Sequence, residues 1–533
     1  MLALLPSSRN SRALSACLSG LLLALCFPNA SILPLLPVAL IPLMAAVDGA
    51  EPRLALGLGG LFGVVFWVAT IPWIAYTVRV YGGVSWTLAL VALLLAASLC
   101  AIPFALMAAA VALVAPRSGA ALVLTWGAAW VLQEGFRTDW FPFGGFPWAL
   151  LGNPLADVPA LVQSAALGGI ALTSFLVAAL NAALHAALTR EERNGRLLWL
   201  AGSCAAVLAA AVAGARHLAV APEPGRPHLR VGIIQPNVKQ ESRWEEGRSL
   251  RLFGDLVAQT RRLVSIDRPD VVLWPESASP YDWPWDAAYR KSVTALAGEL
   301  DVAILLNTVW SDEPERRGAP YYNAALLVTK DGPVLPPYLK QRLVPFGEYV
   351  PLGPLLRFIG PISRAVPGSF TPGPSAAPLP FQGFRLGGAV CYEVVYPWIA
   401  RQHVRAGADV LFTLTNDAWY GKAGARRQHW QAAVLRAVET GRPLVRAAIT
   451  GISGAVDPAG RVIVTLGPDR KGSFAVPLPA PLPAPPAVAL GDAPLWVCAA
   501  GLAAAILRAR ALPPRRPETV RAPDARAVRG VRP

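Results

Sequence analysis

The sequence predicts two kinds of structure in one chain: a multi-pass α-helical membrane domain with about eight transmembrane helices, and a soluble α/β sandwich domain. Two observations lead to this prediction. Only 15% of the 533 residues are charged, against about 25% in soluble proteins, and residues 1–220 are nearly free of charge. Residues 228–480 instead have an ordinary soluble composition, in which strand-like and helix-like segments alternate.

Apolar segments define the expected membrane spans, because a helix needs about 20 residues to cross a bilayer. The segments are 12–27, 31–47, 54–77, 84–115, 119–135, 159–188, 197–218 and 493–511. The second contains three prolines and is the weakest candidate. The first follows two arginines, as a signal peptide would, but the many further spans favour a retained helix.

We therefore expect four parts in the chain. They are a helical membrane domain at 1–220 with about seven spans, a soluble domain at 228–480, a final transmembrane helix at 490–512 and a basic tail at 513–533. Pro477–Pro486 is a proline-rich linker into the last helix.

The distribution of arginine predicts the orientation in the membrane. If the N-terminus is cytoplasmic, the inside loops carry Arg9, Arg12, Arg53, Arg117, Arg190, Arg193, Arg196 and the arginine-rich tail. The outside loops then carry only Arg79, Arg137 and Arg216. The positive-inside rule places both termini in the cytoplasm and the soluble domain outside. The tail also supplies much of the net charge of +15, so nucleic-acid binding is not favoured.

The soluble region is expected to alternate strands and helices. Predicted strands are Leu229–Ile234, Asp270–Leu273, Val302–Thr308, Asn323–Thr329, Phe384–Val390, Val410–Thr415 and Pro443–Ile449. Predicted helices are Glu246–Ile266, Asp286–Leu300 and Arg426–Thr440.

Three residues with reactive side chains follow strand-like runs in this region. Glu276 ends DVVLWPE, Lys340 follows the run Leu326–Leu339 with its Asp331–Gly332 turn, and Cys391 ends LGGAVC. Ligands bind beyond the carboxyl ends of strands in open α/β sheets, so the three side chains would meet at one edge. A base, a cation and a thiol are the groups that cysteine-dependent acyl transfer requires. Singly, each also fits a structural role: a core cysteine, a turn carboxylate or a solvated lysine.

Cys391 is the only one of the six cysteines in the soluble region. The others, Cys17, Cys26, Cys100, Cys204 and Cys498, lie in apolar runs, where cysteine usually behaves as a small hydrophobe. This distribution disfavours a disulfide framework. The sequence also lacks a CxxC or His/Cys ligand cluster, so we expect no metal and no cofactor.

Longer motifs make the combination specific. They are IIQPNV (Ile233–Val238), WPES (Trp274–Ser277), YYNAA (Tyr321–Ala325), LVPFGEYVP (Leu343–Pro351), CYE (Cys391–Glu393), TNDAWYG (Thr415–Gly421) and GRPLVRA (Gly441–Ala447). On these motifs and its whole-chain architecture, the chain resembles the nitrilase superfamily and, more closely, the apolipoprotein N-acyltransferases of bacteria. One departure is that Ala448 and Ile449 stand where that family often has a Thr–Asn pair.

The resemblance implies a nitrilase-like α-β-β-α sandwich as the catalytic domain, facing the periplasm from a multi-pass position in the bacterial inner membrane. It implies Cys391 as nucleophile, Glu276 as general base and Lys340 as oxyanion stabiliser. The acyl donor would be a phospholipid and the acceptor the α-amine of a diacylglyceryl apolipoprotein, acylated through a cysteine thioester. We expect a monomer.

Further residues are expected near the triad. Glu348, Tyr392 and Glu393 are supporting candidates, the backbone N–H of Tyr392 is a candidate oxyanion donor, and Asn323 is a candidate to orient Lys340. Trp244, Trp419 and Trp148 are candidate substrate contacts, with core packing as the alternative for the first two. For Trp148, in an aromatic loop at 136–157, the alternative is an interfacial aromatic belt. The apolar stretch 351–370 is either a membrane-dipping lid or an ordinary buried loop.

Two other functions remain open at this point. One is a membrane-tethered amidase of the nitrilase type, which would hydrolyse a small amide with water as the acceptor. The other is a transporter or receptor with an external binding domain. Ionisable residues within the spans would favour the latter, but the spans contain almost none, and Glu134 near a helix end is the chief exception.

Overall fold

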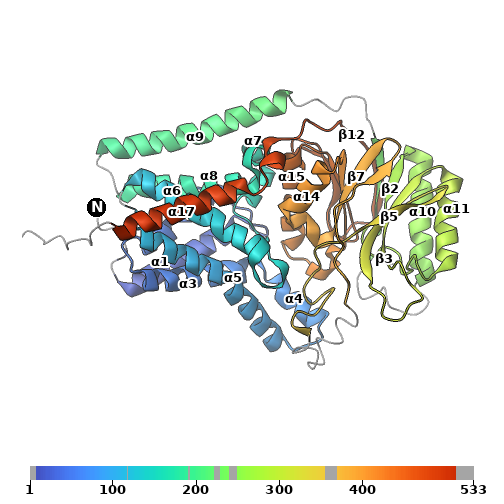
Figure 1. Ribbon diagram of the computed structural model, residues 1–533, viewed down its shortest axis with the longest axis horizontal. Helices are drawn as coiled ribbons and strands as arrows, with labels where there is room; N and C mark the ends of the chain where they lie inside the picture. Colours follow the sequence, from blue (N-terminus) through green and yellow to red (C-terminus); the bar gives the residue numbers. More distant parts are fainter. Residues whose placement is uncertain are drawn as a thin grey trace, which may run out of the picture.

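The computed structural model describes residues 6, 8–116, 118–189, 193–220, 229–238, 249–353 and 369–511. A bundle of helices forms one end of the molecule and a two-sheet sandwich forms the other (Figure 1). Helices α14 (Pro397–Arg405) and α15 (Ala425–Thr440) lie between the bundle and the sheets (Figure 1). The core of the bundle therefore continues into the soluble part, and Phe104, Trp148 and Leu435 belong to one buried apolar cluster.

The bundle is built mainly from sequence before residue 221. Its helices are α1 (Arg9–Leu25), α2 (Ile41–Val47), α3 (Pro52–Thr70), α4 (Trp73–Val80), α5 (Trp86–Val114), α6 (Gly119–Gly135), α7 (Pro159–Val162), α8 (Ser164–Thr189), α9 (Arg193–Val220), α16 (Pro486–Leu490) and α17 (Ala493–Ala511). Five of these, α3, α5, α8, α9 and α17, are long and apolar enough to cross a membrane. The outermost, α9, runs along the edge of the bundle (Figure 1).

The expectation of eight spans is not confirmed. Segment 31–47 forms a short 3₁₀ turn (Leu33–Leu35) and the seven-residue helix α2 instead of one span. Proline lacks the N–H that helix continuation needs, which accounts for this break. Segment 54–77 divides into α3 and α4 because Pro72 disfavours helical geometry at Ile71. Helices α1 and α6 have 17 residues each, fewer than the other candidates.

Two six-stranded sheets form the sandwich, in the orders β12-β1-β2-β3-β4-β5 and β11-β10-β9-β8-β7-β6. The strands are β1 (Leu229–Gln235), β2 (Val271–Leu273), β3 (Ala303–Trp310), β4 (Tyr322–Thr329), β5 (Gly332–Leu339), β6 (Leu379–Phe381), β7 (Phe384–Val390), β8 (Val410–Thr415), β9 (Leu444–Ala448), β10 (Ser453–Val456), β11 (Val462–Leu466) and β12 (Gly472–Leu478). Strands β1–β3 pair in parallel, as do β7–β9. The parallel core strands are almost wholly buried, as expected when both faces of a sheet are covered.

Helices cover the outer face of each sheet. Helices α10 (Ser249–Asp267) and α11 (Ala287–Leu300) pack on the first sheet, and α14 and α15 pack on the second (Figure 1). Between the sheets lies an apolar core that includes Leu327, Val390 and Leu414. The predicted α/β sandwich is therefore confirmed.

The sandwich is fixed to the bundle at a kink in α8. Gly169 has φ +69°, a left-handed conformation that favours glycine, and the helix restarts at Ile170. The Ile170 N–H donates to Glu439 on α15 at 2.6 Å, so a carboxylate caps the restarted helix. Arg436 pairs with the same carboxylate at 2.8 Å.

Candidate active site

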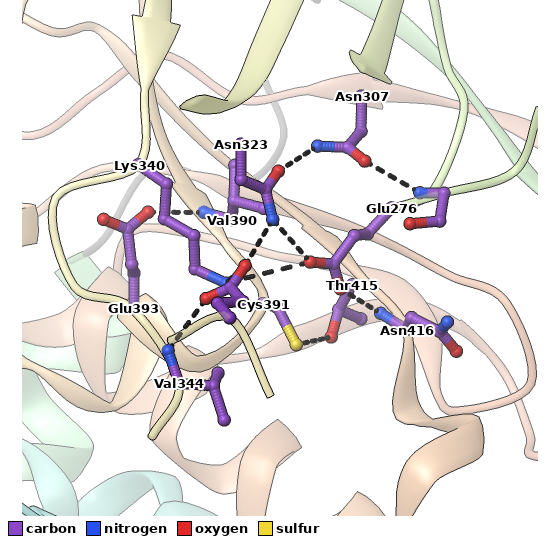
Figure 2. A network of polar contacts seen from close by, with 12 residues as sticks. Glu276, Asn307, Asn323, Lys340, Val344, Val390, Cys391, Glu393, Thr415 and Asn416 are labelled. Carbon is purple, nitrogen blue, oxygen red and sulfur yellow. Dashed lines mark hydrogen bonds and ion pairs between the residues drawn. The ribbon is translucent and has the colours of Figure 1, made fainter. Parts of the chain in front are cut away.

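The three reactive side chains predicted from the sequence lie together at the ends of strands. Glu276 follows β2, Lys340 follows β5 and Cys391 follows β7, and all three are buried (Figure 2). The Lys340 amine lies 3.8 Å from a Glu276 carboxylate oxygen. Strand β8 adds Thr415, whose hydroxyl lies 3.4 Å from the Cys391 sulfur.

Cys391 occupies a sharp turn between β7 and a short 3₁₀ helix (Cys391–Val395). Its φ is +54°, which is uncommon for a non-glycine residue and is found disproportionately at functional sites. The turn is held from two sides. The Val390 N–H donates to Glu393 at 2.7 Å, and His429 Nε2 lies 3.0 Å from the Cys391 carbonyl oxygen.

Glu276 is a buried carboxylate with both oxygens engaged. One oxygen accepts a hydrogen bond from the Asn323 amide at 3.2 Å, and the other accepts from the Asn416 N–H at 2.9 Å. Burial raises the pKa of Glu276, while Lys340 and a hydrogen bond from Cys391 lower it. A raised pKa suits a general base, because proton transfer is most efficient when the base is tuned towards the working pH.

Lys340 lies between two carboxylates, 2.9 Å from Glu348 and 3.8 Å from Glu276. Burial lowers the pKa of Lys340, but the two carboxylates outweigh burial and raise it above its ordinary value, so the amine is a cation. Burial raises the pKa of the Cys391 thiol, and the Glu276 charge raises it further while Lys340 lowers it. The resting sulfur is therefore a thiol, and its proton has to leave during attack.

Asn323 contacts the two carboxylates that face Lys340. Its amide nitrogen donates to Glu348 at 2.6 Å and to Glu276 at 3.2 Å. Its oxygen accepts from Asn307 at 2.6 Å, which fixes the orientation of the amide (Figure 2). Asn323 thus positions the partners of Lys340, and its own backbone carbonyl accepts the Lys340 N–H at 2.8 Å.

Glu393 joins the nucleophile turn to the lysine loop. Besides the Val390 N–H, its carboxylate accepts the Gln341 N–H at 2.6 Å and the Tyr338 hydroxyl at 2.9 Å. Burial raises the pKa of Glu393 to about 7, against the lowering effect of Lys340 and of the backbone donors. The adjacent Tyr392 points the other way, towards the bundle.

A second layer of polar residues lies beneath Cys391, and sequence analysis did not single it out. Asp417 accepts from the Thr415 hydroxyl at 2.9 Å, from His429 at 3.0 Å and from Arg446 at 2.8 Å. Although burial alone raises the pKa of Asp417, Arg446 and His429 hold it well below its ordinary value. The TNDAWYG motif contained the signal: an apolar strand ends in Thr415 and is followed directly by Asn416 and Asp417.

The three predicted substrate tryptophans have different settings. Trp148 is 1% exposed, stacks near Tyr392 and donates its indole N–H to Gln428. Trp419 is 38% exposed and packs edge-on against Tyr81 of the bundle, with ring centres 4.6 Å apart. Trp244 and residues 354–368 of the proposed lid lie outside the described residues.

This arrangement contains every group that cysteine-dependent acyl transfer needs: a thiol, a buried base and a fixed cation. Within the described ranges, no group of three or more His, Cys, Asp or Glu side chains is placed to hold a metal ion. The fold and site define a class of protein: an α/β sandwich that holds a buried cysteine, carboxylate and lysine together, joined to a bundle of helices long and apolar enough to cross a membrane.

Two family models match the chain. Residues 19–183 match the apolipoprotein N-acyltransferase N-terminal domain and residues 230–479 match carbon-nitrogen hydrolase. The apolipoprotein N-acyltransferase of Geobacter metallireducens is 34% identical over 457 residues, covering 84% of this chain and 86% of that protein. The one from Brucella melitensis is 34% identical over 494 residues, covering 88% and 90%. The chain belongs to the apolipoprotein N-acyltransferase family, and it is an acyltransferase and an integral membrane protein.

Solved structures similar to this chain cover its soluble part. An amidase from Nesterenkonia sp. AN1 has a TM-score of 0.37 and 22% identity, covering 51% of this chain and 99% of the amidase. A carbon-nitrogen hydrolase from Helicobacter pylori has a TM-score of 0.36 and 18% identity, covering 47% and 89%.

Proposed function

We propose that the protein transfers a fatty acyl chain from a phospholipid to the α-amino group of a diacylglyceryl-cysteine at the N-terminus of an apolipoprotein. One observation carries the proposal: a buried thiol, carboxylate and ammonium converge where the sandwich meets an apolar helical bundle. The family relationship supplies the acceptor class. Glu276, Lys340 and Cys391 carry the chemistry.

The first half-reaction moves the acyl group to Cys391. Glu276 takes the thiol proton while the sulfur attacks the ester carbonyl of the phospholipid. Lys340 and the Tyr392 N–H stabilise the oxyanion of the tetrahedral intermediate. The ester C–O bond then breaks, and the leaving alkoxide receives the proton from Glu276. The products are a thioester on Cys391 and a lysophospholipid.

The second half-reaction uses the same residues, with Cys391 now as the leaving group. The α-amine of the lipoprotein attacks the thioester carbonyl, and Glu276 accepts a proton from the nitrogen as the new C–N bond forms. The C–S bond breaks, and the Cys391 sulfur regains its proton. An α-amine has a pKa near 7.7–8.0, so a usable fraction is neutral at about pH 7. Ester, thioester and amide follow in sequence without a nucleotide.

The cost of moving an acyl chain through water explains why the catalytic domain is joined to a membrane domain. Burying a lipid chain is worth about 0.8 kcal/mol per CH₂, so a 16-carbon chain would lose on the order of 12 kcal/mol in crossing water. The acyl groups therefore have to reach Cys391 from an apolar phase. We place the catalytic domain on the periplasmic face of the inner membrane, with both termini cytoplasmic, on the basis of the arginine asymmetry.

Mass spectrometry of Cys391 tests the proposal. Purified wild-type protein is incubated with phospholipid vesicles and no acceptor, and we expect the mass of one acyl chain on the peptide that contains Cys391. A diacylglyceryl-cysteinyl peptide should then discharge the thioester as an amide. Glu276→Gln should accumulate little thioester, and Cys391→Ala should accumulate none at this position. An unmodified cysteine in folded wild-type protein would contradict the mechanism, and discharge by water alone would favour an amidase.

A further inference from the structure

The side chain of Arg342, two residues after Lys340, has an unusual setting. Its guanidinium lies over two aromatic rings, 5.1 Å from the centre of the Trp398 ring and 5.6 Å from that of Tyr396. Within the part of the chain that the structure describes, this guanidinium donates no hydrogen bond, and its Nε is buried without a partner. The stacking occupies the face of the cation, so the in-plane N–H groups remain available.

Arg342 is tied to the reaction centre through its backbone. Its N–H donates to one oxygen of Glu393 at 3.2 Å, and the other oxygen accepts the Val390 N–H at 2.7 Å. A single buried carboxylate therefore links the arginine to the residue that precedes Cys391. This link fixes the backbone of Arg342 relative to the nucleophile turn.

A pair of exposed tryptophans lies beside Asp139, whose charge interacts with that of Arg342. Trp140 and Trp496 are 60% and 56% exposed, and their ring centres lie 5.6 Å apart. Exposed tryptophans of this kind mark the interface between lipid tails and headgroups. Asp139, next to Trp140, supplies an opposing charge near Arg342. Among the described residues the buried Trp398 indole N–H is a second donor without a partner, on the ring over which Arg342 lies.

We infer that Arg342 binds the phosphate of the lipid acyl donor. This inference rests on the proposed function and names the group that selects its donor. A guanidinium offers a planar pair of N–H donors that matches two phosphate oxygens, and such charge-assisted pairs are stronger than neutral hydrogen bonds. In a phospholipid only the glycerol backbone separates the phosphate from the ester. An ester at Cys391 therefore brings the phosphate near a cation fixed two residues from Lys340.

The test compares two donors on one enzyme sample. Phosphatidylglycerol and diacylglycerol with identical acyl chains are presented in mixed micelles, and acylation of a diacylglyceryl-cysteinyl peptide is followed by mass spectrometry. The measured quantity is the ratio of kcat/KM for the phospholipid to that for diacylglycerol. Because both donors meet the same sample, the ratio does not depend on the fraction of folded protein.

For full-length Arg342→Gln we expect the ratio to fall about tenfold or more, and for Arg342→Lys, which keeps the charge without the planar pair, a smaller fall. Arg261→Gln, on an exposed ion pair of the sandwich, should leave the ratio unchanged. An unchanged ratio in Arg342→Gln with an active wild type would overturn the inference alone. A wild type that transfers from neither donor would overturn the proposed function as well.

A competition experiment tests whether Arg342 binds the phosphate of a lipid headgroup or free phosphate from solution. Millimolar inorganic phosphate is added to the wild type and to Arg342→Gln. We expect no competition with phospholipid in either protein. Competition in the wild type that Arg342→Gln relieves would show that the arginine takes up phosphate from solution, against its assignment to a lipid.

Discussion

The Lys340 amine makes its short ion pair with Glu348, at 2.9 Å, and stands farther from Glu276, at 3.8 Å. The two buried carboxylates therefore have different relations to Lys340. A buried ammonium requires a close counter-ion, and Glu348 provides it. Glu276 remains within electrostatic reach of Lys340 without a short ion pair, and it is the carboxylate that we propose as the base.

Replacing Glu348 with Gln should lower kcat/KM about a hundredfold, because Lys340 would then turn to Glu276 and weaken the base. Burial raises the pKa of Glu276, and the charge of Glu348 raises it further. Removing that charge lowers this pKa. In the proposed mechanism activity needs ionised Glu276 and is lost as the pH falls through the pKa of this residue, so the acidic limb of the profile should move to lower pH.

A pH series of kcat/KM for wild type and Glu348→Gln checks this shift. Glu299→Gln, which removes a carboxylate from an exposed ion pair, is the matched control and should reproduce the wild-type profile. If the acidic limb of Glu348→Gln stays in place, Glu276 is not the group that this limb reports.

Removing the Thr415 hydroxyl should make the Cys391 thiol harder to ionise. Thr415 has one proton to share between Asp417 at 2.9 Å and the sulfur at 3.4 Å, and its hydrogen bond lowers the pKa of Cys391. In Thr415→Val the pH dependence of Cys391 alkylation should move up by about one unit or more. Thr415→Ser keeps the hydroxyl and should behave like the wild type. Equal profiles for the Val and Ser variants would show that Thr415 acts only through packing.

Glu439 should be essential for holding the sandwich to the bundle. Its carboxylate is fully buried, accepts the Ile170 N–H and pairs with Arg436. In Glu439→Gln the arginine loses its counter-ion in a buried site, which costs about 3 kcal/mol or more. We expect a clear fall in the melting temperature in detergent, whereas Glu299→Gln should show no measurable fall. Equal melting temperatures for the two variants would mean that Arg436 finds another partner.

Trp148 and Trp419 should respond differently to replacement by Ala. Trp148 is buried, so its loss should cost about 3–5 kcal/mol of stability, as for other buried tryptophans. Trp419 is partly exposed beside Tyr81, so Trp419→Ala should keep most of the melting temperature and raise KM for a lipid substrate. Kinetics and melting of both variants separate the two effects. A large melting shift without a KM effect in Trp419→Ala would assign that residue to packing.

Much of the fold could be predicted because the central strands are continuous apolar runs. Strands β1, β3, β7 and β8 coincide with predicted segments to within two residues at each end. Strand β5 is hard to recognise in the sequence because it contains three prolines. The sheet tolerates these prolines because β5 is its edge strand. Strand β11 is an apolar run of only five residues, VIVTL, that our prediction did not include, and as an edge strand it is mostly exposed.

The site was predictable where a motif places a reactive residue after a strand, as for Glu276, Lys340 and Cys391. His429 and Arg446 could not be found in this way. Each lies inside an element that was expected, but no spacing rule connects a helix residue or a strand residue to a cysteine far away in sequence. Their meeting with Asp417 depends on how α15 and β9 pack, which only the tertiary structure gives.

The first strand of the sandwich pairs antiparallel with the last, from Leu229 opposite Leu478 to Gln235 opposite Gly472. As a ribosome makes the chain, β1 is therefore present long before its outer neighbour exists. Until β12 is synthesised, one side of β1 has unpaired N–H and C=O groups, and such edges invite wrong pairing. The nascent chain must keep this edge from associating until nearly the whole enzyme has been made, which makes late truncations more hazardous to folding than their small size suggests.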